Sequence, residues 1–189
     1  MRRQGGFTLV ELMIAMAVLA IVLTLAVPGF ESVVNSNRLT GAANELVNAL
    51  QTARMEAIRR NRRIVVCLSD AAGAATPACS ALAPDGWIGF VDVDRDGSYG
   101  AGDTLLLTST VAAPVRVASS ASVAGKIVFR SDGLARDAAD TLLDGVIAMC
   151  IATRRPASNV RHVGIGSGSR ISTTQVDGNG VCRAPADPS

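Results

Sequence analysis

The sequence has little of what enzymes commonly use for catalysis. Of its 189 residues, one is histidine, one is tryptophan and one is tyrosine, and aromatic residues make up only 3%. His162 lies among expected strand residues without an evident acid or base partner, so no nucleophile–base–acid arrangement is indicated. The turn Gly166-Ser167-Gly168 lacks the lysine and the following helix of a phosphate-binding loop. The sequence therefore predicts that the protein is not an enzyme.

Excess charge and clustered metal ligands are also scarce. The 18 basic residues fall to 16 without Arg2 and Arg3, which equals the 16 acidic residues. The rest of the chain is thus neutral, and no overall attraction to nucleic acid is expected. There is no CxxC motif and no histidine cluster, so no zinc site is expected. With 49% hydrophobic residues but few aromatics, the core must be built from Val, Ile, Leu and Ala.

A long apolar run lies near the amino terminus. From Leu12 to Val27 the only polar residue is Thr24, and Glu11 precedes the run. A helix over Phe7–Val27 would be about 30 Å long, which matches the hydrocarbon thickness of a bilayer. The arginines before it favour a cytoplasmic start and export of the residues downstream. We predict a single membrane span; a buried core helix is the alternative and would need a larger surrounding domain.

The small residues of a signal sequence stand here before the apolar run. A cut after Gly6 would leave the apolar segment on the mature protein, unlike the cut of an ordinary signal peptide. It would also free the α-amino group of Phe7, an ionic partner for Glu11 within one chain or on a neighbour. The alternative is that Glu11 simply lies at the level of the lipid headgroups.

The segment Gly6-Phe7-Thr8-Leu9-Val10-Glu11 resembles the class III leader of type IV pilins and of type II secretion pseudopilins. The resemblance implies that residues 1–6 are a leader, that a prepilin peptidase cuts between Gly6 and Phe7, and that Phe7 is then N-methylated. It also implies that Glu11 supports methylation and docking into a fibre. Pro28 matches the family's helix-kinking proline, so segment 7–28 is expected to be the membrane-spanning, fibre-core half of a longer helix.

Segment 29–61 has the pattern of an amphipathic helix that continues the span with a bend near Pro28. Small and aliphatic residues recur at steps of three and four and form one apolar stripe: Leu39, Ala43, Leu46, Leu50, Ala53 and Ala57. Gly41 and the alanines suit close packing against a sheet. The cluster Arg59, Arg60, Arg62 and Arg63 ends the helix, where cations complement its carboxyl end; contact with an anion is the alternative.

Segment 62–189 has the pattern of a β domain with short strands about ten residues apart. Strands are predicted over residues 64–68, 86–91, 104–111, 114–117, 125–129, 145–151, 161–165 and 170–174, and residues 134–144 as a polar, turn-rich connection. The predicted fold class is α+β: a long amino-terminal helix packed on an antiparallel sheet or sandwich.

Four cysteines occur in the part of the chain expected to be exported: Cys67, Cys79, Cys150 and Cys182. An even number in an oxidising compartment favours two disulfides. Three connectivities remain open, of which Cys67–Cys79 with Cys150–Cys182 closes the shortest loops. Each bridge would contribute roughly 2–4 kcal/mol.

Three features together resemble the pilin-like domain of the GspH/FimT family. They are the cysteine spacing, the run Asp85-Gly86-Trp87-Ile88-Gly89-Phe90-Val91-Asp92 and the run Gly102-Asp103-Thr104-Leu105-Leu106. With the leader, the resemblance spans nearly the whole chain. It implies a long helix packed on β-sheet layers.

Residues 92–103 resemble a twelve-residue calcium loop. Asp92, Asp94 and Asp96 occupy positions one, three and five, Gly97 position six, and Asp103 position twelve. Asp103 replaces the usual glutamate, and the flanks are strand-like. A polar hairpin is the alternative, in which these residues only form the turn. No other cofactor is expected.

DNA-uptake members of the FimT type share a Gly-Arg-x-Arg signature. Here only Arg170 matches, because Ser169 and Ser172 replace the glycine and the second arginine. Four further arginines would compensate if they shared a face: Arg154, Arg155, Arg161 and Arg183.

The sequence thus predicts a minor type IV pilin of the FimU/FimT kind. It would be anchored in the bacterial inner membrane with a periplasmic domain and then extracted into a fibre. Its partners would be a prepilin peptidase and other pilin subunits. The alternatives are a minor pseudopilin of a type II secretion system and a DNA-binding minor pilin.

Overall fold

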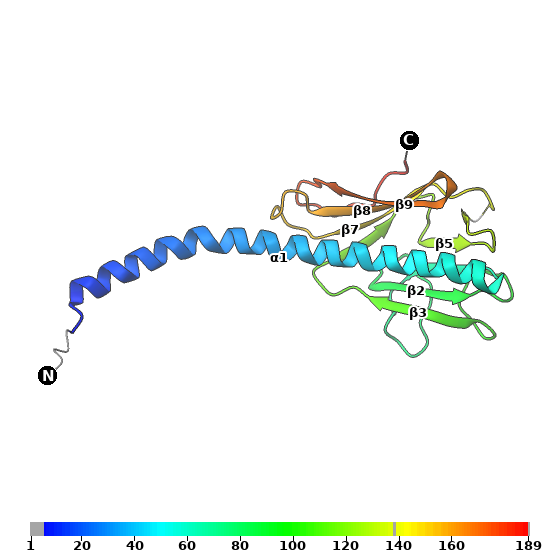
Figure 1. Cartoon of the computed structure of the whole chain (residues 1–189), viewed down its shortest axis with the longest axis horizontal. Coiled ribbons are helices and arrows are strands. Elements are labelled where there is room, and N and C mark those ends of the chain that lie inside the picture. Colours follow the sequence, from blue (N-terminus) through cyan, green and yellow to red (C-terminus); the bar gives the residue numbers. More distant parts are fainter. Residues whose placement is uncertain (1–5, 138, 189) are drawn as a thin grey trace.

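One long helix organises the molecule. The structure, a computed structural model, describes residues 6–137 and 139–188. Helix α1 (Leu9–Arg60) is 52 residues long and is unbroken through positions 28 and 29, so the predicted continuity is confirmed. Its first half projects from the molecule, and its second half lies against the strands (Figure 1).

The end of α1 is set by a left-handed residue. Asn61 has φ 51° and ψ 43°, and the Arg62 N–H donates to the Ala57 carbonyl at 3.2 Å. This is the Schellman arrangement, in which the chain reverses as soon as the helix stops. The last helical turn and the first strand therefore meet at one end of the domain, far from the projecting half.

The strands form two antiparallel sheets, which confirms the predicted fold class. One sheet has the order β3-β2-β1-β5-β6 and the other β4-β7-β8-β9, with the short 3-10 turn η1 (Ser167–Ser169) before the last strand. The strands are β1 (Ile64–Ser69), β2 (Gly86–Val91), β3 (Thr104–Thr110), β4 (Arg116–Ser119), β5 (Lys126–Phe129), β6 (Ala135–Arg136), β7 (Gly145–Cys150), β8 (Val160–Gly166) and β9 (Arg170–Val176).

Three details of the predicted strands were wrong. Strand β4 begins two residues later than predicted, and β9 extends to Val176 because all of its residues pair with β8. The connection 134–144 contains β6, since Ala135 pairs with Phe129 of β5. A two-residue strand in a polar segment has no periodicity, so only its neighbour reveals it.

The core lies between the second half of α1 and both sheets. The six residues of the predicted stripe are all buried, and α1 contacts β1, β2, β5, β7 and β8. They pack in one cluster with side chains of both sheets, among them Trp87 of β2 and Met149 of β7. The stripe therefore positions the whole domain on the helix. Gly41 does not take part: it is exposed, with no atom within 4 Å of where its Cβ would be, so its predicted packing role was wrong.

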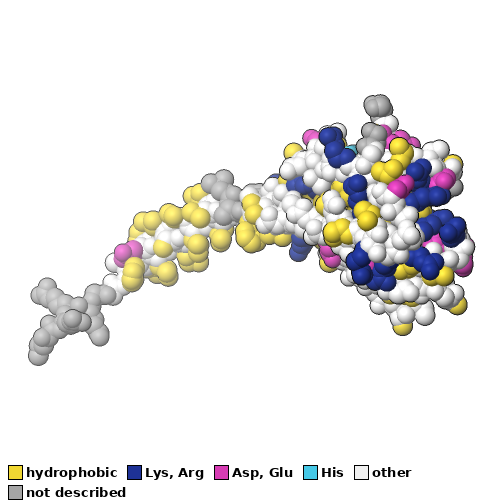
Figure 2. Space-filling model, turned by 45° about the vertical axis from the view of Figure 1, so that its right-hand side comes forward, with side chains coloured by type: hydrophobic (Ala, Val, Ile, Leu, Met, Phe, Trp, Pro, Cys, Tyr) yellow, Lys and Arg dark blue, Asp and Glu magenta, His cyan; other side chains and the backbone are white. Residues whose placement is uncertain are grey.

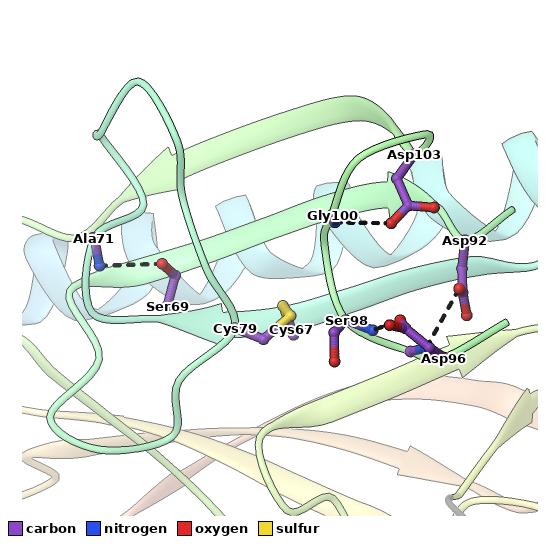
Figure 3. Close-up of a disulfide and its surroundings, with 10 residues drawn as sticks. Cys67, Ser69, Ala71, Cys79, Asp92, Asp96, Ser98, Gly100 and Asp103 are labelled. Atoms are coloured by element: carbon purple, nitrogen blue, oxygen red, sulfur yellow. Dashed lines mark hydrogen bonds between the residues drawn. A yellow bond between two sulfur atoms is a disulfide. The ribbon is translucent and has the colours of Figure 1, made fainter. Parts of the chain in front are cut away.

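The outer face of the first sheet is covered by two loops. Cys67 of β1 forms a disulfide with Cys79 in the loop 70–85 (Figure 3). Tyr99 in the loop 92–103 packs on Phe90 of β2. Strands β1 and β2 are consequently buried on both faces, which explains their continuous apolar sequences.

The second disulfide fixes the carboxyl-terminal segment. Cys150 at the end of β7 is bonded to Cys182, and the Gly178 N–H donates to the Asn159 side chain at 2.8 Å. Both bonds follow the connectivity with the shortest loops, and no cysteine is free.

Candidate assembly segment and polar surfaces

The first residues of α1 form a capped helix start. Thr8 is the N-cap residue, and its hydroxyl accepts from the Glu11 N–H at 3.2 Å. Glu11 thereby occupies the first turn, where a carboxylate interacts favourably with the helix dipole. Phe7 is 84% exposed, and nothing lies within 4 Å of a Cβ on Gly6. Residues 1–5 of the expected leader lie outside the described residues.

The predictions of cleavage, methylation and docking at Gly6, Phe7 and Glu11 stay predictions. The role of Thr8 was missed, although the spacing Thr-x-x-Glu is the sequence signature of a capping box. Glu11 thus has a local role at the helix start in addition to any role between chains.

The projecting half of α1 is apolar on all sides and is not covered. Twelve large apolar side chains between positions 7 and 23 are each 51% to 84% exposed. The helix contains a window with mean hydropathy 2.7, none of it buried, and is long and apolar enough to cross a membrane. Figure 2 shows this yellow segment projecting from a domain whose surface is mixed. Such a surface is the mark of a segment that is covered by lipid or by other chains.

The acidic loop 92–103 brings only part of its predicted calcium set together. Carboxylate oxygens of Asp92, Asp94 and Asp96 lie within 4.8 Å of one another, and Gly97 is left-handed (φ 71°). Asp103 is not part of this group. Its carboxylate accepts from the Val93 N–H at 2.9 Å and from the Gly100 N–H at 3.0 Å; Figure 3 shows the second of these bonds.

Asp92 is already engaged within the protein. Its buried carboxylate pairs with Arg63 at 2.9 Å and accepts from the Gly97 N–H at 3.3 Å. Burial raises the pKa of Asp92, and the hydrogen bond and Arg63 oppose this shift. These contacts support the polar-hairpin interpretation. Calcium binding stays a prediction, which the absence of titration heat with millimolar calcium would reject.

The arginines considered for DNA contact do not share one face. Arg170 is exposed beside Ser169, whose carbonyl accepts from Arg54 near the end of α1. The Arg155 carbonyl accepts from Asn35, about 28 Å earlier along the helix. Arg155 also lies 3.6 Å from Glu31.

Arg161 is removed from the surface altogether, because it is only 4% exposed. Its guanidinium donates to the Ser158 carbonyl at 2.8 Å and to the Ser36 hydroxyl of α1 at 3.0 Å. Burial lowers its pKa. Compensation for the incomplete Gly-Arg-x-Arg signature was predicted if four arginines shared a face. That prediction is wrong for the full set of Arg154, Arg155, Arg161 and Arg183. Arg161 instead joins β8 to the helix.

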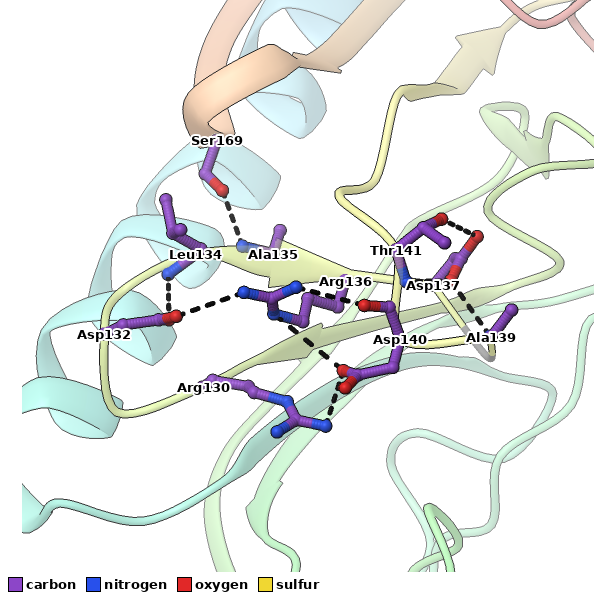
Figure 4. A network of polar contacts seen from close by, with 10 residues as sticks. All are labelled: Arg130, Asp132, Leu134, Ala135, Arg136, Asp137, Ala139, Asp140, Thr141 and Ser169. Atoms are coloured by element: carbon purple, nitrogen blue, oxygen red, sulfur yellow. Dashed lines mark hydrogen bonds and ion pairs between the residues drawn. The ribbon is translucent and has the colours of Figure 1, made fainter.

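A network of charges surrounds the segment around β6. Arg136 lies between Asp132 and Asp140, at 3.3 and 3.8 Å, and Arg130 also pairs with Asp140 (Figure 4). Ser169 is the uncharged member of the network. Its hydroxyl accepts a hydrogen bond from the Ala135 N–H and so connects the turn after β8 to β6. The network fixes the loops at the end of the domain where α1 finishes.

The arginine cluster at the end of α1 is divided between two environments. Arg59 and Arg60 share one carboxylate, Glu56, whose pKa falls to about 2 because both guanidinium groups donate to it. Arg62 and Arg63 lie beyond the helix. The prediction that these arginines complement the negative end of the helix dipole therefore applies only to Arg59 and Arg60.

Two sequence profiles match this chain. The profile described as Type II transport protein GspH covers residues 42–169, and the prokaryotic N-terminal methylation motif covers residues 1–27. Two proteins of Pseudomonas aeruginosa named Fimbrial protein are each 40% identical over 65 residues, or 34% of this chain. The chain spans 42% of the length of these relatives.

A solved structure shares the fold. The crystal structure of the type IV minor pilin FimU of Pseudomonas aeruginosa aligns with a TM-score of 0.51 at 24% identity, over 74% of this chain and 90% of the other. The chain has one long helix with an exposed apolar start, which packs on antiparallel sheets that carry two disulfides. These features define a type IV pilin-like protein. The GspH match covers most of the sequence, and the chain belongs to the GspH family. Both the family and the fold are those of structural pilins.

Proposed function

We propose that this protein is a minor type IV pilin that is built into a pilus fibre and helps to prime its assembly. The observation that carries the proposal is the uncovered apolar half of α1. Fully burying one large apolar side chain contributes about 1.5–3 kcal/mol, and twelve such side chains are more than half exposed here. A surface of this kind favours the inner membrane before assembly and neighbouring pilin helices afterwards.

The proposed joint between subunits consists of Phe7 and Glu11. Cleavage after Gly6 by a prepilin peptidase creates an ammonium group on Phe7, which is then methylated. An unpaired carboxylate away from water is costly. Glu11 therefore pairs with the terminal ammonium of its own chain or of a neighbour when the helix enters the fibre.

The joint is tested with Glu11→Ala and Glu11→Gln in the producing cell. We expect both variants to be cleaved normally and to be absent from sheared fibres, because neither carries the charge. Asp144→Asn, the same chemical change at an exposed position of the domain, is the control and is expected to assemble. Mass spectrometry of wild-type fibres should show N-methyl-Phe7 as the first residue. Normal incorporation of Glu11→Ala would refute the proposed joint.

The second candidate is a minor pseudopilin of a type II secretion system. It is supported by the description of the matching family as a type II transport protein. Deleting the gene separates the two functions: loss of surface pili with normal protein secretion supports the pilin, and the opposite result supports the pseudopilin.

DNA binding is a weaker third candidate and depends on Arg170, which is exposed at the start of β9. A gel-shift measurement with the full chain in a nonionic detergent tests it. No retardation of DNA at low salt would reject this candidate.

A further inference from the structure

A basic cavity lies at the end of the domain opposite to the projecting half of α1. It has a volume of about 470 Å³ and is lined by five arginines and one carboxylate: Arg60, Arg62, Arg63, Arg95, Arg130 and Asp92. The arginines come from the end of α1, the link between α1 and β1, the acidic loop and the turn after β5. Figure 2 shows blue side chains over this end of the domain.

The carboxylate in the wall does not neutralise this cavity. Asp92 is paired with Arg63 and with the Gly97 N–H, so its charge is already balanced within the protein. Arg60 shares Glu56 with Arg59, and Arg130 shares Asp140 with Arg136. Among residues 6–137 and 139–188, Arg62 and Arg95 are in no ion pair. The cavity therefore presents an excess of guanidinium groups.

A second cavity continues the basic surface. It has a volume of about 410 Å³, shares Arg63 and Arg95 with the first, and adds Lys126 of β5 and one carboxylate, Asp96, so that three cations face one carboxylate in its lining. A Cβ on Gly97 would lie 3.1 Å from Lys126 Nζ and 3.4 Å from Arg63 Nη2, so both cations lie beside one backbone position. Arg63 is already paired with Asp92, so among the described residues Lys126 is the one of these two cations that is in no ion pair.

The charge and shape of the two cavities select the class of ligand. Guanidinium groups bind carboxylates and phosphates in the same forked geometry, but the charges of Arg62, Arg95 and Lys126 together exceed the single charge of a carboxylate. Neither lining contains an aromatic side chain on which a base would stack. The site also lies at the end of the domain far from the apolar segment, which argues against lipid headgroups.

We propose that these two cavities bind an anion built of linked phosphate groups, with Arg62 and Arg95 as its free guanidinium contacts and Lys126 extending the site. The second cavity lengthens the site beyond what a single phosphate can fill. A longer phosphate chain therefore gains contacts that orthophosphate cannot make. The site is separate from the assembly segment and can be occupied while the apolar helix is covered.

The test is a calorimetric titration of the full chain in a nonionic detergent with tripolyphosphate and with orthophosphate. We expect saturable binding of tripolyphosphate that is about tenfold or more tighter than that of orthophosphate and weakens with added salt. The variant Arg62→Gln/Arg95→Gln should lose about tenfold or more in affinity. Both residues are exposed, so the fold should persist.

The control is Arg116→Gln/Arg183→Gln, which removes the same charge from two exposed arginines elsewhere. It should bind tripolyphosphate like the wild type. Absence of saturable binding, equal affinity for the two phosphates, or equal weakening by both variants would overturn the proposal. Equal weakening would mean that only the net charge of the protein matters.

Discussion

Removing the two disulfides separately should weaken the β domain by different amounts. The bond Cys67–Cys79 spans 12 residues of sequence and Cys150–Cys182 spans 32. The loop-closure model gives a stabilisation of about 2.8 kcal/mol for the first and about 3.7 kcal/mol for the second at 25 °C. The paired substitutions Cys67→Ala/Cys79→Ala and Cys150→Ala/Cys182→Ala should therefore differ by about 0.9 kcal/mol.

The lone tryptophan provides the assay. Trp87 is fully buried on β2, within the core that joins both sheets to α1, so its fluorescence reports unfolding of the domain. For a urea dependence of about 2 kcal/mol per molar, the unfolding midpoint should fall by about 1.4 M for the first pair and about 1.9 M for the second. The full chain in a nonionic detergent keeps the helix in place for all variants.

The order of the two losses is the critical result. A larger loss for the shorter loop would refute the loop-closure reasoning. It would show that the covering of Cys67 by the loop 70–85 contributes more than the constraint on the unfolded chain. Mild reduction of the wild type, which opens both bonds, should lower the midpoint more than either paired substitution.

Two further predictions use the same fluorescence assay. Leu50→Ala, which truncates a fully buried side chain of the helix stripe, should lower the free energy of unfolding by about 2–5 kcal/mol. Met55→Ala on the exposed side should change it by no more than about 0.5 kcal/mol. Equal losses would contradict the assignment of the packed face. Burial lowers the pKa of His162 below 6.5, so the unfolded chain binds its proton more tightly. Stability should therefore decline as the pH falls from about 6.5 toward the folded pKa and level off below it. His162→Gln should flatten this decline below about pH 6.5, and an unchanged slope would assign it to other groups.

The sequence predicted the elements whose signals are local. The stripe from Leu39 to Ala57 recurs at helical spacing, and strands β1 and β2 are continuous apolar runs, so both were recognisable without a structure. Gly41 was misplaced although its face was readable, because a position two residues from both Leu39 and Ala43 lies about 200° around the helix, on the side away from the stripe. β6 was missed because its two residues gain strand geometry only from β5.

The polar sites depended on contacts between distant segments. Arg161 looked like a surface cation, yet it is buried against Ser36, which lies 125 positions away in the sequence. The convergence of Arg63 and Lys126 on Gly97 requires β1, β5 and the acidic loop to meet. Thr8 was the exception, since its capping signature with Glu11 is local and was readable.

The continuity of α1 has a mechanical consequence. The same unbroken helix is the projecting segment and the support of the domain, so tension applied to the projecting half travels along the helix axis into the domain. The buried stripe runs parallel to that axis, so the force acts along the interface between the helix and both sheets. The contacts of the stripe therefore resist the force together rather than breaking one after another. The loop 70–85 and the carboxyl-terminal segment are held by disulfides and cannot be drawn out to full length. A subunit of this design is suited to being pulled by its helix without losing its domain.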